Sequence, residues 1–203
     1  MNTKKIAILI IGTLFLLVPI VKAQSKFHVI LDYHYNLGLS EKYWGKTFNR
    51  KENKMHGNSL HFTALYDITQ RISAGAGIGA DRYEEPGYNT FPVYGTFRYR
   101  PLPKFLDGYV FTDLGYGIIK NDNVAQGWMW NVGVGYTKMF RKHFGLNFQL
   151  GYNLKEFGGI PSYEVDFVNG EFNYVGKKSS IRHSVSFGTD WCFNSKKDRA
   201  SIK

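Results

Sequence analysis

The stretch "FGLNFQLGYNL", residues 144–154, alternates bulky apolar residues with small or polar ones along its whole length. The apolar positions are Phe144, Leu146, Phe148, Leu150, Tyr152 and Leu154. The positions between them carry glycine, asparagine and glutamine. Because successive side chains of a β-strand point to opposite faces, the pattern predicts a strand with one apolar face.

The same alternation recurs along the chain. With 144–154 it predicts eight strands, at 27–39, 59–68, 72–80, 91–99, 109–118, 128–140, 144–154 and 181–193. Most of these runs are about nine to thirteen residues long, which exceeds the usual five or six residues of a globular strand. A tilted strand needs roughly nine to eleven residues to cross a bilayer. The run lengths therefore favour strands that span a membrane.

The composition of the two faces supports the same interpretation. In a soluble barrel the bulky apolar face points inward, and charged residues coat the outside. Here the apolar face is long and rich in aromatic residues, and the other face is small or polar with few lysines. This distribution is typical of a barrel with lipid outside and a packed polar interior.

The connections between the predicted strands alternate in length. Short segments at 69–71, 100–107 and 141–143 contrast with long ones such as 40–58 and 157–180. Outer-membrane barrels have long extracellular loops and short periplasmic turns, and an even strand count lets them close without an edge. The predicted fold is all-β, an eight-stranded antiparallel up-and-down transmembrane β-barrel.

The first residues differ from the rest of the chain. Lys4 and Lys5 precede an apolar run, 6–21, and Val21, Lys22 and Ala23 form a small-x-small cleavage pattern. This predicts a cleaved secretory signal peptide at 1–23, and an uncleaved membrane anchor is the alternative. The predicted barrel occupies 24–193, and a short basic periplasmic tail follows at 194–203.

The 203-residue chain carries a formal charge of +10. Removal of the predicted signal peptide takes away lysines and no acids, so the remainder stays basic. For an exported chain this charge favours anionic lipid headgroups over nucleic acid, and a merely basic soluble surface is the alternative. Cys192 is the one cysteine, so no intramolecular disulfide is expected.

The run "SVSFGTDWCF", 184–193, carries a second signal. Ser186, Gly188, Trp191 and Phe193 follow the order polar-x-Gly-x-x-aromatic-x-aromatic. In this the chain resembles the small eight-stranded outer-membrane β-barrels of the OmpX and OmpA-transmembrane type, within the porin superfamily. The resemblance implies an insertion signal read by the barrel-assembly machinery, and a location in a Gram-negative outer membrane. Trp191 and Phe193 would lie in the aromatic girdle at the periplasmic interface.

Charged and imidazole side chains on the predicted inward faces are expected to form a hydrogen-bonded interior network, because buried charges are tolerated only when paired. The expected members are His28, Asp32, His34, His61, Asp67, Arg98, Asp113 and Arg182. His28 and His34 lie about 20 Å apart along one strand, too far to share a metal ion. No metal, cofactor or catalytic site is predicted.

Two motifs resemble catalytic or nucleotide-binding patterns. In "GAGIGAD", 75–81, the glycines fall on one strand face and no helix follows, so they are expected to make room for large interior neighbours rather than to bind phosphate. Lipid A deacylases use a His-x-Ser pair on one strand face. Here His183 and Ser184 are adjacent and Val185 stands where the serine is needed, so the pair is not expected to be catalytic.

The first long connection mixes aromatic and basic residues. Its basic positions are Lys42, Lys46, Arg50, Lys51 and Lys54. They are candidates for contact with lipopolysaccharide phosphates or with a protein partner, and an ordinary solvated loop is the alternative. The expected function is non-enzymatic, with a structural or loop-mediated interaction role. A lipid A-modifying or other outer-membrane enzyme and a soluble exported lipocalin-like binder are the alternatives. A general pore is disfavoured because side chains fill the interior of a barrel of about eight strands.

Overall fold

The computed structural model describes residues 27–43, 45–85, 87–118, 124–140, 144–166 and 171–194. The predicted signal peptide and positions 195–203 of the predicted tail lie outside the described residues, and both stay predictions. The described residues form ten β-strands: β1 (Phe27–Tyr43), β2 (Lys46–Asn49), β3 (His56–Asp67), β4 (Ile72–Glu84), β5 (Tyr88–Thr90), β6 (Pro92–Tyr99), β7 (Gly108–Gly117), β8 (Trp128–Met139), β9 (Phe144–Asp166) and β10 (Glu171–Asn194). Nowhere in this part of the chain is there a helix with the length and apolarity needed to cross a membrane.

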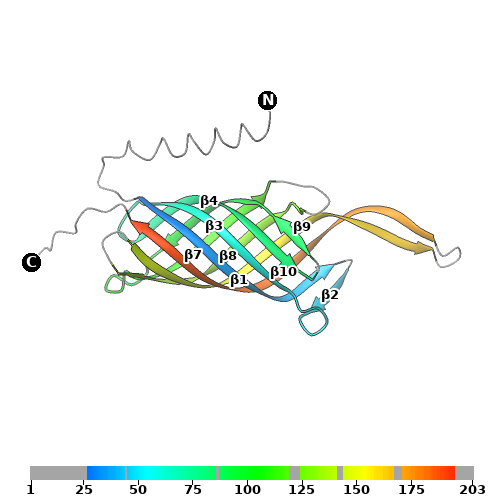
Figure 1. The fold of residues 1–203 in the computed structure, drawn as a ribbon, viewed down its shortest axis with the longest axis horizontal. Coiled ribbons are helices and arrows are strands. Elements are labelled where there is room, and N and C mark those ends of the chain that lie inside the picture. The colour runs from blue at the N-terminus through cyan, green and yellow to red at the C-terminus, as the bar shows by residue number, and fades with distance from the viewer. Residues whose placement is uncertain are drawn as a thin grey trace, which may run out of the picture.

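Eight of these strands form a closed antiparallel barrel, and β2 and β5 are short additions beside β1 and β4 (Figure 1). The barrel strands pair in the order β10-β9-β8-β7-β6-β4-β3-β1, and β10 then pairs with β1. The closing pair places Asp32 opposite Asp190 and Tyr35 opposite Phe187. Closure leaves no unpaired barrel edge. The predicted all-β, eight-stranded antiparallel up-and-down fold is confirmed.

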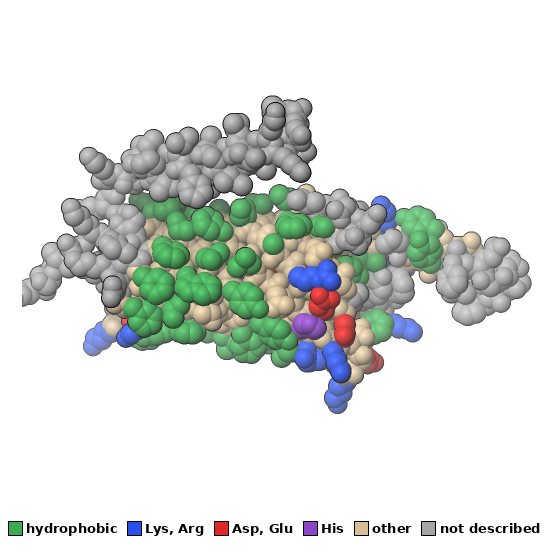
Figure 2. Space-filling view, in the orientation of Figure 1, with side chains coloured by type: hydrophobic (Ala, Val, Ile, Leu, Met, Phe, Trp, Pro, Cys, Tyr) green, Lys and Arg blue, Asp and Glu red, His purple; other side chains and the backbone are tan. Residues whose placement is uncertain are grey.

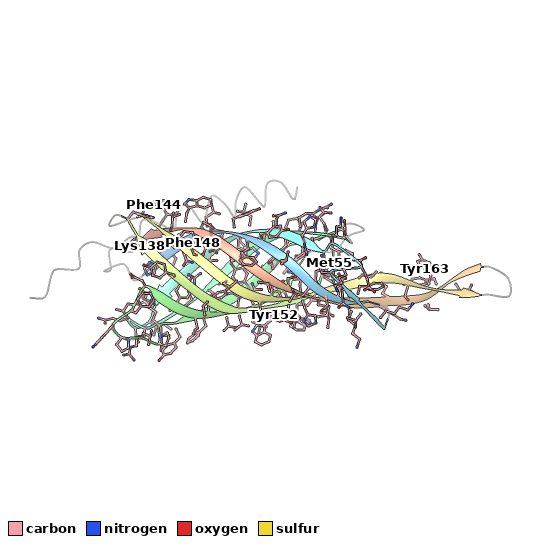
Figure 3. All side chains as sticks on the ribbon, turned by 90° about the horizontal axis from the view of Figure 1, so that it is seen from below. Met55, Lys138, Phe144, Phe148, Tyr152 and Tyr163 are labelled. Atoms are coloured by element: carbon pink, nitrogen blue, oxygen red, sulfur yellow. The ribbon has the colours of Figure 1, made fainter. Side chains whose placement is uncertain are left out.

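The alternation in the sequence corresponds to the two surfaces of the barrel wall. On β9, Phe148 and Leu150 are about half exposed on the outside, whereas Asn147 and Gln149 are buried inside. Figure 3 labels Phe144, Phe148 and Tyr152 along this strand. Figure 2 shows the same type of surface over the visible wall, where hydrophobic side chains cover the middle and charged ones gather at the ends. The barrel therefore has a polar interior and an apolar exterior.

The segment expected to be a long loop at 157–180 is instead mostly a β-hairpin. β9 and β10 are 23 and 24 residues long and project past the barrel as a two-stranded ribbon (Figure 1). The rings of Tyr163 and Tyr174 pack across it with centroids 5.7 Å apart. The sequence pattern does not reveal this ribbon, because a ribbon beyond the barrel has no apolar core face to impose a period of two. Backbone pairing and the cross-strand contact of the two tyrosine rings continue the strands.

Of the other predicted connections, the one at 69–71 is short as expected, and 100–107 joins β6 to β7. At the end where β3 meets β4, the Thr69 Oγ1 atom accepts hydrogen bonds from the backbone N–H groups of Arg71 and Ile72 and stabilises a tight turn. The long segment 40–58 is partly strand, because β1 continues to Tyr43 and pairs with β2. The predicted short connection at 141–143 lies outside the described residues.

Two glycines on β4 make room for large interior rings. A Cβ atom on Gly77 would lie 2.3 Å from Cζ of Tyr94, and one on Gly79 would lie 2.1 Å from Cδ2 of His61. Both distances are far below van der Waals contact. The prediction that the glycines of this motif accommodate bulky neighbours is confirmed for these two, whereas a Cβ atom on Gly75 would instead meet the backbone of Ala64.

Candidate functional site

The interior of the barrel differs from an ordinary apolar protein core, because most of its buried side chains are polar or charged. All eight residues predicted for an interior network do point inward, since each lies on the face opposite the apolar one. They do not form a single group. They divide into levels along the barrel axis, each completed by residues that the sequence analysis did not select.

The level nearest the β3–β4 turn joins His28 to Asp67. The Nε2 atom of His28 lies 2.7 Å from Oδ2 of Asp67, and Ser73 Oγ donates to Oδ1 of the same carboxylate at 2.7 Å. Arg100 Nη1 donates to Ser73 Oγ at 2.8 Å and lies 3.8 Å from Asp67. This half-buried cluster closes that end of the interior.

The middle level is built around Asp190, which is fully buried. Its Oδ2 atom accepts hydrogen bonds from Asn147 Nδ2 and from Gln149 Nε2, the latter at 2.5 Å. Arg98 donates to Tyr109 Oη at 3.2 Å, and its guanidinium carbon lies 4.9 Å from the centroid of that ring. Amide groups and a guanidinium thus fill the centre of the barrel.

Asp32 and Asp113 belong to the same level. Thr63 Oγ1 donates to Asp32 Oδ2 at 2.7 Å and also bonds with Tyr94 Oη at 2.6 Å. Asp113 accepts from Asn131 Nδ2 at 3.4 Å. The predicted participation of both aspartates in hydrogen bonding is therefore observed.

The next level is an ion-pair cluster centred on Asp81. His61 Nε2 lies 2.7 Å from Asp81 Oδ1, while Lys155 Nζ lies 2.9 Å and Thr90 Oγ1 2.8 Å from Oδ2. Lys155 is fully buried, which is tolerable only because its charge is paired. The prediction selected His61 but missed Asp81 and Lys155. The continued alternation of their strands was the signal that could have found them.

The end of the barrel farthest from the β3–β4 turn is closed by Arg182. Its Nε and Nη2 atoms lie 2.7 and 2.6 Å from Oε2 of Glu41. Its Nη1 and Nη2 atoms donate to the backbone carbonyls of Glu84 and Glu85 at 2.9 and 3.0 Å. The guanidinium also lies over the rings of Tyr83 and Phe157, 5.6 and 5.4 Å from their centroids.

Glu41 falls within the long connection predicted at 40–58, but in the structure it lies on β1 and points into the barrel. The register of β1 against β10 shifts between Gly38 and Ser40. Before this bulge the even-numbered residues of β1 point inward. After it the odd-numbered Glu41 points inward and is only 2% exposed. A bulge adds one residue to one strand and so reverses the faces that follow it.

The residues of the predicted insertion signal lie on both faces of β10. Trp191 and Phe193 are exposed on the outside, at 39% and 50%, whereas Ser186 and Gly188 point inward. A Cβ atom at Gly188 would lie 2.5 Å from Cε1 of His34, so this glycine also has a packing role. Recognition by the assembly machinery stays a prediction.

The basic residues of the first long connection, Lys42, Lys46, Arg50, Lys51 and Lys54, are all exposed. Arg50 is partly used in holding the connection together, since its Nη1 atom donates to the backbone carbonyl of Met55 at 2.6 Å. Contact of the exposed lysines with lipopolysaccharide phosphates or a protein partner stays a prediction.

His183 and Ser184 point to opposite faces, as predicted. His183 Nδ1 bonds with Tyr152 Oη on the outside of the wall, while Ser184 is fully buried inside. The two side chains therefore do not form a nucleophile–base pair in the described residues.

Comparison with known proteins finds a similar solved structure at low sequence identity. No family model matches the chain, and no curated protein matches it. Among solved structures it is similar to the solid-state NMR structure of outer membrane protein AlkL in DMPC lipid bilayers. The two chains share 14% sequence identity with a TM-score of 0.45, and the similarity covers 87% of this chain and 92% of that one.

Proposed function

We propose that this chain is a transmembrane β-barrel of the outer membrane with a filled, non-conducting interior, and that it acts non-enzymatically through its outer loops. The observation that carries the proposal is the inverted polarity of the barrel. Large apolar side chains are exposed on every barrel strand, whereas Asp, Glu, Lys and Arg side chains are buried inside. A barrel surrounded by water would bury the apolar face instead.

The height of the apolar band matches a membrane. On β9 the outward positions from Phe144 to Leu154 are uninterrupted by charge. At about 3.4 Å per residue they extend about 34 Å along the strand, or about 26 Å along the axis at a tilt near 40°. The apolar band of an outer-membrane barrel is about 25 Å tall. Lys138 lies at the Phe144 end of this band (Figure 3).

The membrane location is tested by refolding the protein into vesicles that contain brominated lipid. Trp130 and Trp191 are 40% and 39% exposed on the outer wall, so lipid bromine is expected to quench their fluorescence. Trp130→Phe should reduce that quenching, and Trp130→Phe combined with Trp191→Phe should reduce it further. Unheated protein should also run differently from heated protein on a gel after detergent extraction. Equal mobilities and unquenched Trp130 would indicate a soluble, lipocalin-like protein and contradict the proposal.

The filled interior supports a non-conducting barrel. Arg182, Glu41, Tyr83 and Phe157 close one end and are each at most 2% exposed. The paired Asp81 and Lys155 occupy the lumen in the neighbouring level, on the side of the β3–β4 turn. In planar bilayers the protein should produce no steady channel currents, and regular conductance steps would contradict this part of the proposal.

The interaction role rests on the exposed lysines of the first long connection. Lys42, Lys46 and Lys51 present positive charges that suit phosphates of lipopolysaccharide. Changing all three to Gln should weaken binding of phosphorylated lipid A to the refolded protein, and should have no effect with dephosphorylated lipid A. Lys104→Gln with Lys138→Gln, on exposed residues at the opposite end, is the control, and it removes two charges instead of three. Losses of affinity in proportion to the number of charges removed would mean that only net charge matters.

A further inference from the structure

Asp32, His34 and Asp190 meet in the interior of the barrel, although β1 and β10 are at opposite ends of the chain. One potential ligand atom from each lies within 4.8 Å of the others. We propose that these three residues bind a divalent transition-metal ion with zinc-like ligand preferences. The proposal is independent of the loop-mediated role above. The sequence pattern predicts no metal, because the side chains that meet here come from strands at opposite ends of the chain.

The distances suit a tetrahedral ion. Two ligands that are each about 2.1 Å from a zinc ion lie about 3.4 Å apart in tetrahedral geometry. His34 Nε2 lies 3.6 Å from Asp190 Oδ1. Asp32 and Asp190 are directly paired in the closing β1–β10 register, so their carboxylates approach from neighbouring strands. A water molecule would supply the fourth ligand, as it does where three protein ligands hold zinc.

In each of the three side chains, one polar atom forms a hydrogen bond that would orient the side chain for binding a metal ion through its other polar atom. Asp32 Oδ2 accepts from Thr63 Oγ1 at 2.7 Å. Asp190 Oδ2 accepts from the Asn147 and Gln149 side-chain amides. His34 Nδ1 lies 3.2 Å from Ser186 Oγ, which leaves Nε2 facing Asp190. Metal ligands in proteins typically have such outer partners, which set their orientation.

The remaining carboxylate oxygens have no partner. Asp32 Oδ1 and Asp190 Oδ1 are both buried without a hydrogen bond, in residues only 3% and 0% exposed. Two buried carboxylates side by side without a donor between them are strongly destabilising. Arg98, the cation of this level, donates to Tyr109 and is not bonded to either Oδ1 atom. A divalent cation between the carboxylates would satisfy both oxygens at once.

Imidazole nitrogen with carboxylate oxygens is a donor set that suits zinc and related divalent ions. The test uses the full protein refolded in detergent, stripped with chelator and then titrated with Zn²⁺ alone. We expect one zinc ion bound per chain, measured by elemental analysis and by competition with a chromogenic chelator. Cobalt substitution should give the absorption bands of a tetrahedral site.

Asp32→Asn combined with Asp190→Asn removes both carboxylate ligands with little change in shape. Zinc affinity should fall by at least about 10–100-fold, the size of effect seen even for outer partners of metal ligands. Asp67→Asn is the matched control, because Asp67 is also an interior aspartate paired with a histidine but lies in another level. It should bind zinc as the wild type does. If the double variant does not refold, His34→Gln tests the same site through its nitrogen ligand.

Two results would overturn the proposal. Refolded wild type that binds no zinc even at a large excess would mean that the two carboxyl groups share a proton instead. Equal zinc binding by wild type, the Asp32/Asp190 variant and His34→Gln would place the ion elsewhere, such as at the half-buried His56 or at His183 on the outer wall.

Discussion

Replacement of Glu41 by Gln should destabilise the barrel by about 3 kcal/mol, because it leaves Arg182 buried beside a neutral partner. The change keeps the shape of the side chain and removes its charge. Arg182 is fully buried and directs two N–H groups at Oε2 of Glu41, at 2.7 and 2.6 Å. Ser180 Oγ also bonds to the other carboxylate oxygen of Glu41.

The magnitude follows from what remains after the change. Removing one partner of a buried ion pair typically costs about 3–5 kcal/mol. Arg182 keeps its hydrogen bonds to the carbonyls of Glu84 and Glu85, so the lower end of that range is expected. Arg182→Met added to Glu41→Gln removes the remaining charge, and the double variant should lose less than the sum of the single ones. A coupling energy of about 2 kcal/mol is expected between the two positions.

The assay is equilibrium urea unfolding in lipid vesicles, followed by tryptophan fluorescence and approached from both the folded and the unfolded protein. Glu52→Gln is the control, because the Glu52 carboxylate is exposed and bonds only to a local backbone N–H in the described structure. It should change the free energy of unfolding by no more than about 0.5 kcal/mol. A loss below about 1 kcal/mol for Glu41→Gln would refute the buried pairing, and with it the placement of the bulge before Glu41.

Three further outcomes are expected. Phe148→Arg places a charge on the middle of the lipid-facing wall and should reduce the free energy of folding into bilayers by about 2–4 kcal/mol, measured by urea titration; unchanged folding would mean that the faces of β9 are reversed. Gly77→Ala forces a methyl group against the Tyr94 ring and should lower the free energy of unfolding by about 1–3 kcal/mol in the same titration. Gly95→Ala is the control and should lower it less, because a Cβ atom at Gly95 lies on the outer wall with its nearest neighbour 3.9 Å away. Trp191→Ser combined with Phe193→Ser should leave unfolded protein in the periplasm, as measured by cell fractionation and unheated gels. Deletion of positions 195–203 should leave assembly intact. The opposite pair of results would mean that β10 does not carry the insertion signal.

Much of the barrel could be predicted from the sequence because its two surfaces have opposite chemistry. Each strand has lipid-compatible side chains on one face and polar ones on the other, and this period of two can be recognised without any knowledge of the partners. The inward positions of His28, Asp32, His34 and His61 follow from it. The prediction weakens where that contrast ends. The ribbon of β9 and β10 beyond the barrel has no core face, so the sequence pattern there predicts a loop.

The interior pairings could not be predicted in the same way, because the alternation shows the face of a residue but not its neighbour. Asp190 lies beside Asp32 only because β10 closes on β1 in one particular register. Lys155 reaches Asp81 across the lumen from a strand that is not adjacent to β4.

Alternating hydrophobicity by itself determined that this chain is a barrel with a polar interior. Outward side chains are apolar and inward side chains are polar, and this contrast does not depend on which residues they contact. Only the tertiary structure decided which interior charges meet. Strand register, the bulge between Gly38 and Ser40, and closure of the barrel together set those contacts. A one-residue shift in strand register, or loss of the bulge, would exchange the faces or the partners of these residues without changing the local sequence pattern.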